Sequence, residues 1–153
     1  MAEENDEEEN RKHYRFGITL RLFHPDADPD DITNALGIRP KRAWRAGEPR
    51  STPIGQPLPG LYRETYWYKD VGKGEYRNGS LVAALSDLAE TYKPFERFFK
   101  SFRGSGGRIE FFVHWIFYHN SGDVFDFGLL GKLADLGIDL SFDVYASDGM
   151  DLD

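Results

Sequence analysis

The sequence predicts a single α/β (α+β) domain with a four-stranded mixed sheet and helices mainly on one face. Three observations lead to this fold class. Apolar residues alternate with polar ones in several short segments, which is the period of a half-buried strand. Segments with the apolar spacing of a helix separate these strands. The length of 153 residues is that of one domain.

Two stretches of the chain carry nearly the same pattern. Residues 14–38 and 108–138 each contain an alternating strand that ends at a histidine, an acidic stretch, a helical segment and a closing Leu-Gly-Ile. We therefore expect pseudo-duplicated strand-helix-strand halves, with parallel neighbouring strands within each half. The nearest familiar arrangement is loosely ferredoxin-like, although a helix stands where that fold has a hairpin.

The first strand is predicted from Tyr14 to His24, where every second residue is apolar. Asp28 can cap a helix, Pro29 suits its first turn, and Gly37 can adopt the left-handed conformation that ends it. Residues 39–63 contain five prolines and three glycines. We therefore expect a long, basic, proline-rich loop without regular hydrogen bonding there.

A further strand is predicted at residues 65–69, and Ser80 can cap a long helix with one apolar stripe. Pro94 should kink or break that helix before a phenylalanine-rich turn. The strand that begins at Arg108 is apolar on both faces and should lie centrally in the sheet. A helix capped by Asp126 then leads to a last strand at residues 140–146, so that the predicted domain covers residues 14–147.

Charge is distributed unevenly along the chain, whose formal net charge is -7. Residues 1–13 are predicted to form a disordered acidic tail, and residues 148–153 a frayed C-terminus. Residues 39–63 are basic, but the negative total disfavours a general nucleic-acid binder. The lack of cysteine, of a long apolar run and of a secretory leader favours a cytoplasmic protein without a membrane segment.

Several dispersed motifs carry a resemblance to a known family. They are Asp30-Asp31-Ile32-Thr33 with Leu36-Gly37-Ile38 and Pro40, Gly47-Glu48, Trp67, Leu129-Leu130 with Leu136-Gly137-Ile138, and Asp143-Val144-Tyr145. In these motifs, residues 14–146 resemble an uncharacterised bacterial family known as domain of unknown function 4279. The resemblance implies a small bacterial cytoplasmic protein, and it supplies no reaction and no catalytic residue.

Polar and aromatic side chains alternate with the apolar ones on the predicted strands, and they define a candidate ligand-binding face. Exposed aromatic groups often mark contact surfaces. The alternatives are an ordinary solvated face and a face covered by the proline-rich loop. The candidate residues on this face are Arg21, Thr19, His114, Tyr118, Asp143, Tyr145 and one of Tyr66, Trp67 or Tyr68.

A second candidate surface is the start of the basic loop, from Arg39 to Glu48. Arg42, Trp44 and Arg45 combine charge with a ring, which can clamp an anionic or planar ligand. Single-stranded nucleic acid is bound by the same residue types. The alternative, which we favour, is a solvated loop in which Trp44 is buried against the core and Glu48 lies in a turn.

His24 and His119 end corresponding strands, and each is followed by aspartates. Neutral imidazole and carboxylates can bind zinc, and pseudo-symmetry could bring the two groups together. The compact spacing of metal ligands is missing, however, and aspartate near a helix start already serves as a cap. We therefore expect no metal and no cofactor.

The sequence favours a non-catalytic recognition protein that binds a protein partner or a small polar ligand through this face and loop. An acidic domain that neutralises a basic partner, as immunity proteins neutralise toxins, is an analogous case. Common catalytic motifs are missing, so the catalytic residues are unknown. One alternative is a hydrolase-type enzyme with His114, Asp143 and Arg21 gathered within about 3 Å of each other or of a common substrate atom. The other is a self-associating module that forms a homodimer.

Overall fold

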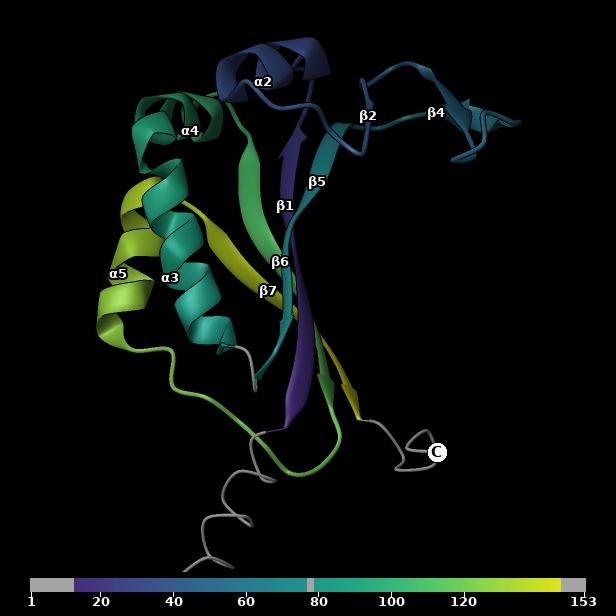
Figure 1. Ribbon diagram of the computed structural model, residues 1–153. Coiled ribbons are helices and arrows are strands. Elements are labelled where there is room, and N and C mark those ends of the chain that lie inside the picture. The colour runs from purple at the N-terminus through teal and green to yellow at the C-terminus, as the bar shows by residue number, and fades with distance from the viewer. Residues whose placement is uncertain (1–12, 77–78, 147–153) are drawn as a thin grey trace, which may run out of the picture.

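The structure is a computed structural model that describes residues 13–76 and 79–146. The predicted acidic tail, apart from His13, and the predicted frayed C-terminus lie outside these residues. Figure 1 shows a mixed sheet with α3 (Leu81–Tyr92) and α5 (Phe127–Leu136) together on one side of it. The α/β class is therefore confirmed, and the helices lie mainly on one face of the sheet.

The sheet has the strand order β2-β5-β1-β6-β7. Its central strand, β1 (Tyr14–His24), pairs antiparallel with β5 (Thr65–Glu75) on one side and with β6 (Arg108–Phe117) on the other. β2 (Arg42–Trp44) pairs antiparallel with the outer side of β5, and β7 (Asp139–Ala146) pairs parallel with β6. β6 thus lies inside the sheet, as predicted, and β2 and β7 are its edges.

The prediction of four strands and an irregular loop at residues 39–63 is wrong. This segment contributes β2 to the main sheet, which has five strands within the described residues. It also forms β3 (Pro49–Ser51) and β4 (Pro57–Leu61), which pair with each other in a separate hairpin. Each of these two strands begins with a proline, and the missing N–H of proline is tolerated at the first residue of a strand.

The two halves of the chain differ in strand direction. In the second half the chain crosses through α5 and returns parallel to β6, as predicted for a helical crossover. In the first half it passes through α2 (Pro29–Leu36) and the hairpin before β5, which runs antiparallel to β1. The prediction of parallel neighbours is therefore wrong there. The ferredoxin-like comparison is not confirmed, since no strand separates β6 from β7.

The helices begin at the predicted capping residues. The side chains of Asp28, Ser80 and Asp126 accept hydrogen bonds from backbone N–H groups in the first turns of α2, α3 and α5. A short 3-10 turn that contains a proline separates α3 from α4 (Glu96–Gly104), as expected for a helix breaker. Among the described residues, no helix combines the length and apolar character needed to cross a bilayer.

The hydrophobic core lies between the sheet and the helices. Alternate residues of the long strands point into it, so the remaining residues of the same strands lie on the opposite face. This opposite face is called the open face below. The largest core side chains include Tyr14, Ile18, Leu20, Leu22, Trp67, Leu81, Leu85, Phe99, Ile109, Phe111 and Val113.

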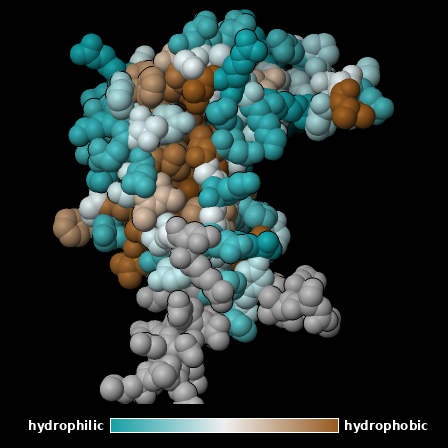
Figure 2. All heavy atoms as spheres, viewed as in Figure 1, coloured by the Kyte–Doolittle hydropathy of each residue, from teal (hydrophilic) through white to brown (hydrophobic). Residues whose placement is uncertain are grey.

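The hairpin of β3 and β4, residues 49–61, forms an arm. Figure 1 shows that the arm extends away from the sheet on the side opposite to α3 and α5. Its side chains include Ile54 and Leu61, which are 81% and 59% exposed, and Figure 2 shows apolar atoms near its outer end. The fold therefore places a projecting, partly apolar arm beside the open face.

Candidate functional site

Every strand of the main sheet contributes side chains to the open face. The register places Arg21 of β1 opposite Tyr68 of β5 and Glu110 of β6. Arg42 and Trp44 of the edge strand β2 lie opposite Tyr68 and Tyr66 of β5. Candidates that are far apart in the sequence therefore share one surface, and they include residues from the segment that was predicted to be a loop.

Three rings surround the guanidinium group of Arg21 on this face. Its Cζ atom lies 4.6 Å from the ring centroid of Phe112, 5.1 Å from that of Phe23 and 5.6 Å from that of Tyr66. A cation over an aromatic face contributes about 0.5 to 1 kcal/mol where solvent is near. A guanidinium group stacked in this way keeps the N–H donors at its edge free for a carboxylate or a phosphate.

Arg21 also forms an ion pair with Glu110, in which Nε and Oε1 are 3.1 Å apart. The two side chains are only 25% and 16% exposed. The contact is electrostatic, because the buried Nε–H does not have the geometry of a hydrogen bond to the carboxylate. Glu110 thus orients the Arg21 side chain and offsets the charge of Arg21, but it does not engage all the N–H donors of the guanidinium group.

The pattern of rings and guanidinium groups continues to the arm. Arg42 lies over the ring of Trp44, with 4.9 Å between Cζ and the centroid, and Arg108 lies over Phe23 at 4.4 Å. The ring of Trp44 also stacks on Tyr62, with 4.5 Å between centroids and an interplanar angle of 12°. We call this set the arginine–aromatic layer; it consists of Arg21, Phe23, Arg42, Trp44, Tyr62, Tyr66, Tyr68, Arg108 and Phe112.

Hydrogen bonds join the base of the arm to the open face. The guanidinium group of Arg42 donates to the carbonyl oxygen of Ser51 at 2.6 Å and to the hydroxyl of Tyr62 at 3.3 Å. The backbone N–H of Ser51 donates to the same hydroxyl at 3.1 Å. This bond from Ser51, together with the charge of Arg42, lowers the pKa of Tyr62. The arm is therefore held at a defined position beside the layer.

Arg45 and Glu48 belong to the turn that follows β2. The Glu48 carboxylate accepts the backbone N–H of Arg45 at 3.3 Å, and the Glu48 N–H donates to the Arg45 carbonyl at 3.1 Å. The Arg45 guanidinium group pairs with Asp28 at 3.3 Å. The structure thus places these two predicted binding residues in local contacts. Trp44, in contrast, is not buried against the core as expected, since it lies half-buried on the open face.

His114, Asp143 and Tyr145 lie on another part of the open face. The Tyr145 hydroxyl donates to the Asp143 carboxylate at 2.7 Å, which raises the pKa of Tyr145. The ring centroids of His114 and Tyr145 are 4.6 Å apart. His114 is opposite Gly17 on β1, so Arg21 lies four residues away, or roughly 13 Å along the strand. The three residues of the enzyme alternative are therefore not gathered together.

A shallow hollow of about 570 Å³ lies on the open face at Gly17. A Cβ atom at this position would meet no other heavy atom within 4 Å. Glycine inside a strand weakens the strand and often marks a place where a ligand or another backbone approaches closely. The side chains around the hollow come from the three longest strands, and they are Arg15, Lys73, Glu75, His114 and Ile116.

Two predicted face residues need separate mention. Trp67 does not lie on the open face: it is fully buried on the helix side, and its Nε1 donates to the Thr33 hydroxyl at 3.0 Å. Tyr66 and Tyr68 occupy the open face instead. Tyr118 lies just beyond the end of β6, and its ring is 4.9 Å from that of His13 between centroids.

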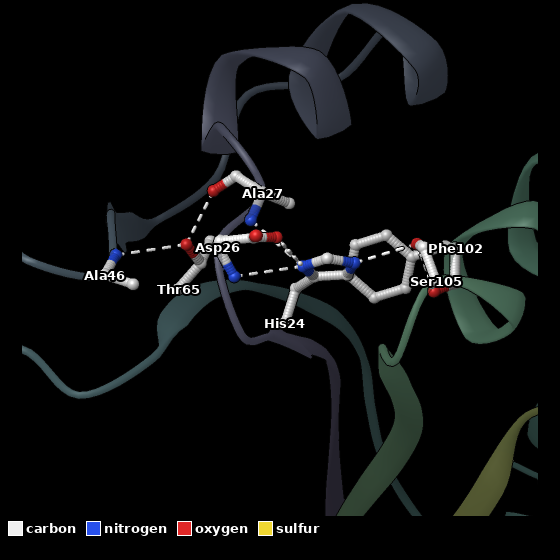
Figure 3. Close-up of polar contacts among 7 residues, drawn as sticks. All are labelled: His24, Asp26, Ala27, Ala46, Thr65, Phe102 and Ser105. Carbon is white, nitrogen blue, oxygen red and sulfur yellow. Dashed lines mark hydrogen bonds and ion pairs between the residues drawn. The ribbon is translucent and has the colours of Figure 1, made fainter.

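His24 has a structural environment, which Figure 3 shows. It is 5% exposed, and its Nδ1 accepts the backbone N–H groups of Asp26 and Ala27 at 3.1 and 2.9 Å. Its Nε2 is 2.8 Å from the hydroxyl of Ser105, which in turn donates to the Phe102 carbonyl. Because Nδ1 accepts two N–H groups, the ring carries its proton on Nε2 and bonds to Ser105 as a donor.

The buried hydroxyl of Thr65 extends this structural network (Figure 3). It donates to the carbonyl oxygen of Ala27 at 2.5 Å and accepts the backbone N–H of Ala46 at 3.1 Å. The expectation that pseudo-symmetry could bring His24 close to His119 is wrong, because β1 and β6 are antiparallel and these residues are at opposite ends of the sheet. Across residues 13–76 and 79–146, no group of three or more histidine, aspartate and glutamate residues could hold a metal ion.

Several residues of the layer were missed in the sequence. Phe23 and Phe112 are of a residue type that is common in cores. Only the alternation of each strand, in which they fall between buried residues, could have placed them on the open face. Tyr62 carries no such signal, because its contact with Trp44 depends on the arm. Gly17 lies within the predicted first strand, but its hollow appears only when three strands are assembled.

Comparisons with known proteins identify one family. The family described as Domain of unknown function (DUF4279) matches residues 12–147, which is most of the chain. None of the curated proteins matches the chain, and none of the solved structures matches it.

Proposed function

We propose that this chain, which belongs to the DUF4279 family of domains of unknown function, is a non-catalytic recognition protein that binds a protein partner through its open face. The arginine–aromatic layer is the observation that carries this proposal. Arginine and aromatic side chains are enriched in the energetically important parts of protein interfaces. We place the protein in the bacterial cytoplasm as part of the same proposal, which the lack of cysteine favours.

The layer is prearranged for binding. Each of its three guanidinium groups lies over a ring, and Arg42 is also fixed by the base of the arm. A partner therefore meets side chains that have already lost much of their conformational freedom, which reduces the entropic cost of association. The rings supply apolar contact area, and the guanidinium edges supply directed donors.

The charges near the layer favour an acidic partner. Residues 39–63, which include the arm, carry six basic side chains and one acidic side chain. Association is guided by the charge of the contacting surface, even where the total charge of the protein has the opposite sign. The analogy with immunity proteins suggested a basic partner from the total charge, whereas the local charge of residues 39–63 supports a partner that presents carboxylates.

A protein partner fits this face better than a small ligand. Sites for small molecules usually enclose most of the surface of the ligand. The hollow at Gly17 has a suitable volume of about 570 Å³, but it is shallow and lies on the surface of a sheet. The layer is likewise a broad surface formed by four strands, β1, β2, β5 and β6, and the base of the arm.

The test uses the peptide Glu-Glu-Phe-Glu-Glu as a probe and the full chain labelled with ¹⁵N. We expect amide shifts to cluster on the open-face residues of β1, β2 and β5 and to shrink as salt is added. Arg42→Ala and Tyr66→Ala should each weaken binding about tenfold, which is the usual loss at an important interface residue. Lys100→Ala removes an exposed charge on α4 and serves as the matched control.

Two results would contradict the proposal. One is a set of shifts that are equally large on the helices and on the open face. The other is a loss of affinity for Lys100→Ala as large as that for Arg42→Ala, because binding would then depend only on total charge.

Self-association through β7 is a second candidate function, and it is supported by the exposure of that edge strand. Phe142 and Val144 are 39% and 57% exposed, and no strand of the described residues pairs with the outer side of β7. Antiparallel pairing of two β7 strands about Phe142 would place Val144 opposite Leu140 and would avoid facing carboxylates. Light scattering should then show a dimer that Val144→Lys makes monomeric; a monomer at every concentration contradicts this candidate.

A further inference from the structure

We infer that the free edge of β7 takes up an extended segment of another protein in which basic and apolar residues alternate. The inference goes beyond the proposed function, because β7 contributes no residue to the arginine–aromatic layer. Three features of β7 support it: a regular backbone at the edge of the sheet, exposed apolar side chains on one side of the strand, and carboxylates on the other side.

In the part of the chain that the structure describes, the main sheet has one long edge strand. β2, at one end of the strand order, has three residues, whereas β7, at the other end, has eight. β7 contains no proline or glycine, and its pairing with β6 continues without a bulge from Asp139 to Ala146. Short strands, prolines and bulges commonly protect a sheet edge. β7 therefore presents a regular row of backbone N–H and C=O groups, to which a further strand can be added.

The apolar side of β7 lies on the face of the sheet that carries the helices. Phe142 packs against Phe125, with 5.4 Å between ring centroids, and against Trp115 at 5.6 Å. Phe142 and Val144 are nevertheless exposed, and so is Val124, the residue before Phe125. The helices thus leave an apolar strip uncovered along the outer part of β7. Apolar side chains of an added strand would pack on this strip.

The other side of β7 is acidic. Asp139 and Asp143 lie on the open face, and residues 133–146 contain three aspartates but no lysine, arginine or histidine. Asp139 pairs with Arg103 at 3.6 Å, whereas Asp143 forms no ion pair with any residue of the described ranges. A lysine or arginine placed across from either aspartate on an added strand would form a cross-strand pair of opposite charge.

The two sides of β7 together specify the sequence of the added strand. Side chains that face each other on neighbouring strands lie on the same side of the sheet. Residues across from Asp139 and Asp143 should therefore be basic, and the residues between them, which face the strip at Phe142 and Val144, should be apolar. The alternation of β7 itself thus selects a segment that alternates between basic and apolar residues.

The same carboxylates disfavour pairing with a second copy of this chain. Antiparallel pairing about Phe142 places Asp143 opposite Ser141 of the second copy, so the two Asp143 side chains become diagonal neighbours. Their like charges repel, whereas a basic segment converts each carboxylate into a favourable partner. The edge therefore discriminates against the self-association considered above and accepts a strand of opposite charge.

The test uses two probes of equal composition and the full chain labelled with ¹⁵N. The strand probe is Lys-Val-Lys-Phe-Lys-Val-Lys, and the block probe is Lys-Lys-Val-Phe-Val-Lys-Lys. With the strand probe, we expect shifts of the β7 amides and of the indole N–H of Trp115, which has no hydrogen-bond partner among the described residues and lies beside Phe142. The indole N–H of Trp67, which is bonded to Thr33, serves as the internal control. The block probe should bind about tenfold more weakly, because it cannot place basic and apolar residues alternately.

Paired variants test the carboxylates. The double variant Asp139→Asn and Asp143→Asn should weaken binding of the strand probe about two- to thirtyfold, because it removes two cross-strand charge pairs. The double variant Asp31→Asn and Asp87→Asn removes the same charge from exposed positions on α2 and α3, and it should leave this binding nearly unchanged.

The inference and the proposed function can fail separately. Arg42→Ala should weaken binding of Glu-Glu-Phe-Glu-Glu and leave binding of the strand probe unchanged, because Arg42 lies on the opposite edge strand. Equal loss of both would overturn the inference, since the strand probe would then bind at the arginine–aromatic layer.

Three further results would overturn the inference. The first is equal affinity for the strand probe and the block probe. The second is an equal loss in the two double variants, because binding would then depend only on total charge. The third is a set of β7 shifts that appear without a probe as the protein concentration rises, because these would assign the edge to a second copy.

Discussion

The two faces of the sheet use the same strands for different purposes. On β1, Leu20 and Leu22 are fully buried beneath the helices, while Arg21 and Phe23 are half-buried among other rings and charges of the open face. Burying a large apolar side chain contributes about 1.5 to 3 kcal/mol, whereas a cation–aromatic contact near solvent contributes about 0.5 to 1 kcal/mol. The covered face therefore supplies most of the stability, and the open face can carry groups selected for contact with a partner.

The neighbours Trp67 and Tyr66 give the strongest test of this difference. Trp67→Ala should lower the free energy of unfolding by about 3 to 5 kcal/mol, because it leaves a cavity in the core. Tyr66→Ala should cost about half of that or less, since its ring is only half-buried. Denaturant unfolding measures both losses. Equal losses would show that the open face also acts as a core.

The same substitution, glycine to valine, tests this comparison at two positions, one on each face. A Cβ atom at Gly74 would lie 2.8 Å from the ring of Phe16, so Gly74→Val should destabilise the protein by about 1 to 3 kcal/mol through overpacking. A Cβ atom at Gly17 meets no heavy atom within 4 Å, so Gly17→Val should leave stability unchanged or raise it by up to about 1 kcal/mol through strand propensity. It should still weaken peptide binding, because it fills the hollow. Thermal unfolding and peptide titration of both variants check this pair, and a loss of stability in Gly17→Val comparable to that in Gly74→Val would contradict it.

Two threonines extend the comparison to polar groups. Thr65→Val should cost about 1 to 2 kcal/mol, because it removes both bonds of a buried hydroxyl and leaves the partner groups unsatisfied. Thr19→Val removes an exposed bond of 3.1 Å to Asp70 and should have little effect. Unfolding in urea distinguishes the two variants, and a larger loss for Thr19→Val would reverse the comparison.

The substitution of Asp70 should have the smallest effect on stability, and this effect should depend on pH. The hydrogen bond that Asp70 accepts from Lys41, assisted by that from Thr19, lowers the pKa of Asp70 below the ordinary value of 3.8. A carboxylate with a lowered folded-state pKa stabilises the protein above its unfolded pKa, and this contribution is lost as the pH falls through the folded value. Asp70→Asn should therefore lower the melting temperature slightly at neutral pH and not at all well below pH 3.8. A difference that grows on acidification would contradict this sign.

Much of the fold could be predicted because local chemistry decides it. The alternation in β1 and the caps Asp28, Ser80 and Asp126 predicted elements that the structure contains. β2 was missed because three residues are too few to show a period. The directions of β1 and β5 were also wrong, since strand pairing depends on tertiary contacts that the sequence pattern does not encode.

The candidate site was less predictable. Arg21 and His114 were placed on the open face because the strands around them alternate clearly. In Tyr66, Trp67 and Tyr68 three aromatic residues follow one another, so composition does not show which of them point outward. The stacking of Tyr62 on Trp44 depends on the arm, which was itself predicted to be irregular.

The central position of β1 has a consequence for biosynthesis. This strand leaves the ribosome before the other strands of the sheet, and the second of its two partners is synthesised only at residues 108–117. Until then a strand with an apolar side has at least one unpaired edge, which is a common route to association between nascent chains. Pairing between such distant segments also slows folding. Chains interrupted before residue 108 should therefore accumulate as aggregates, and the yield of native protein should depend on how quickly translation passes β6.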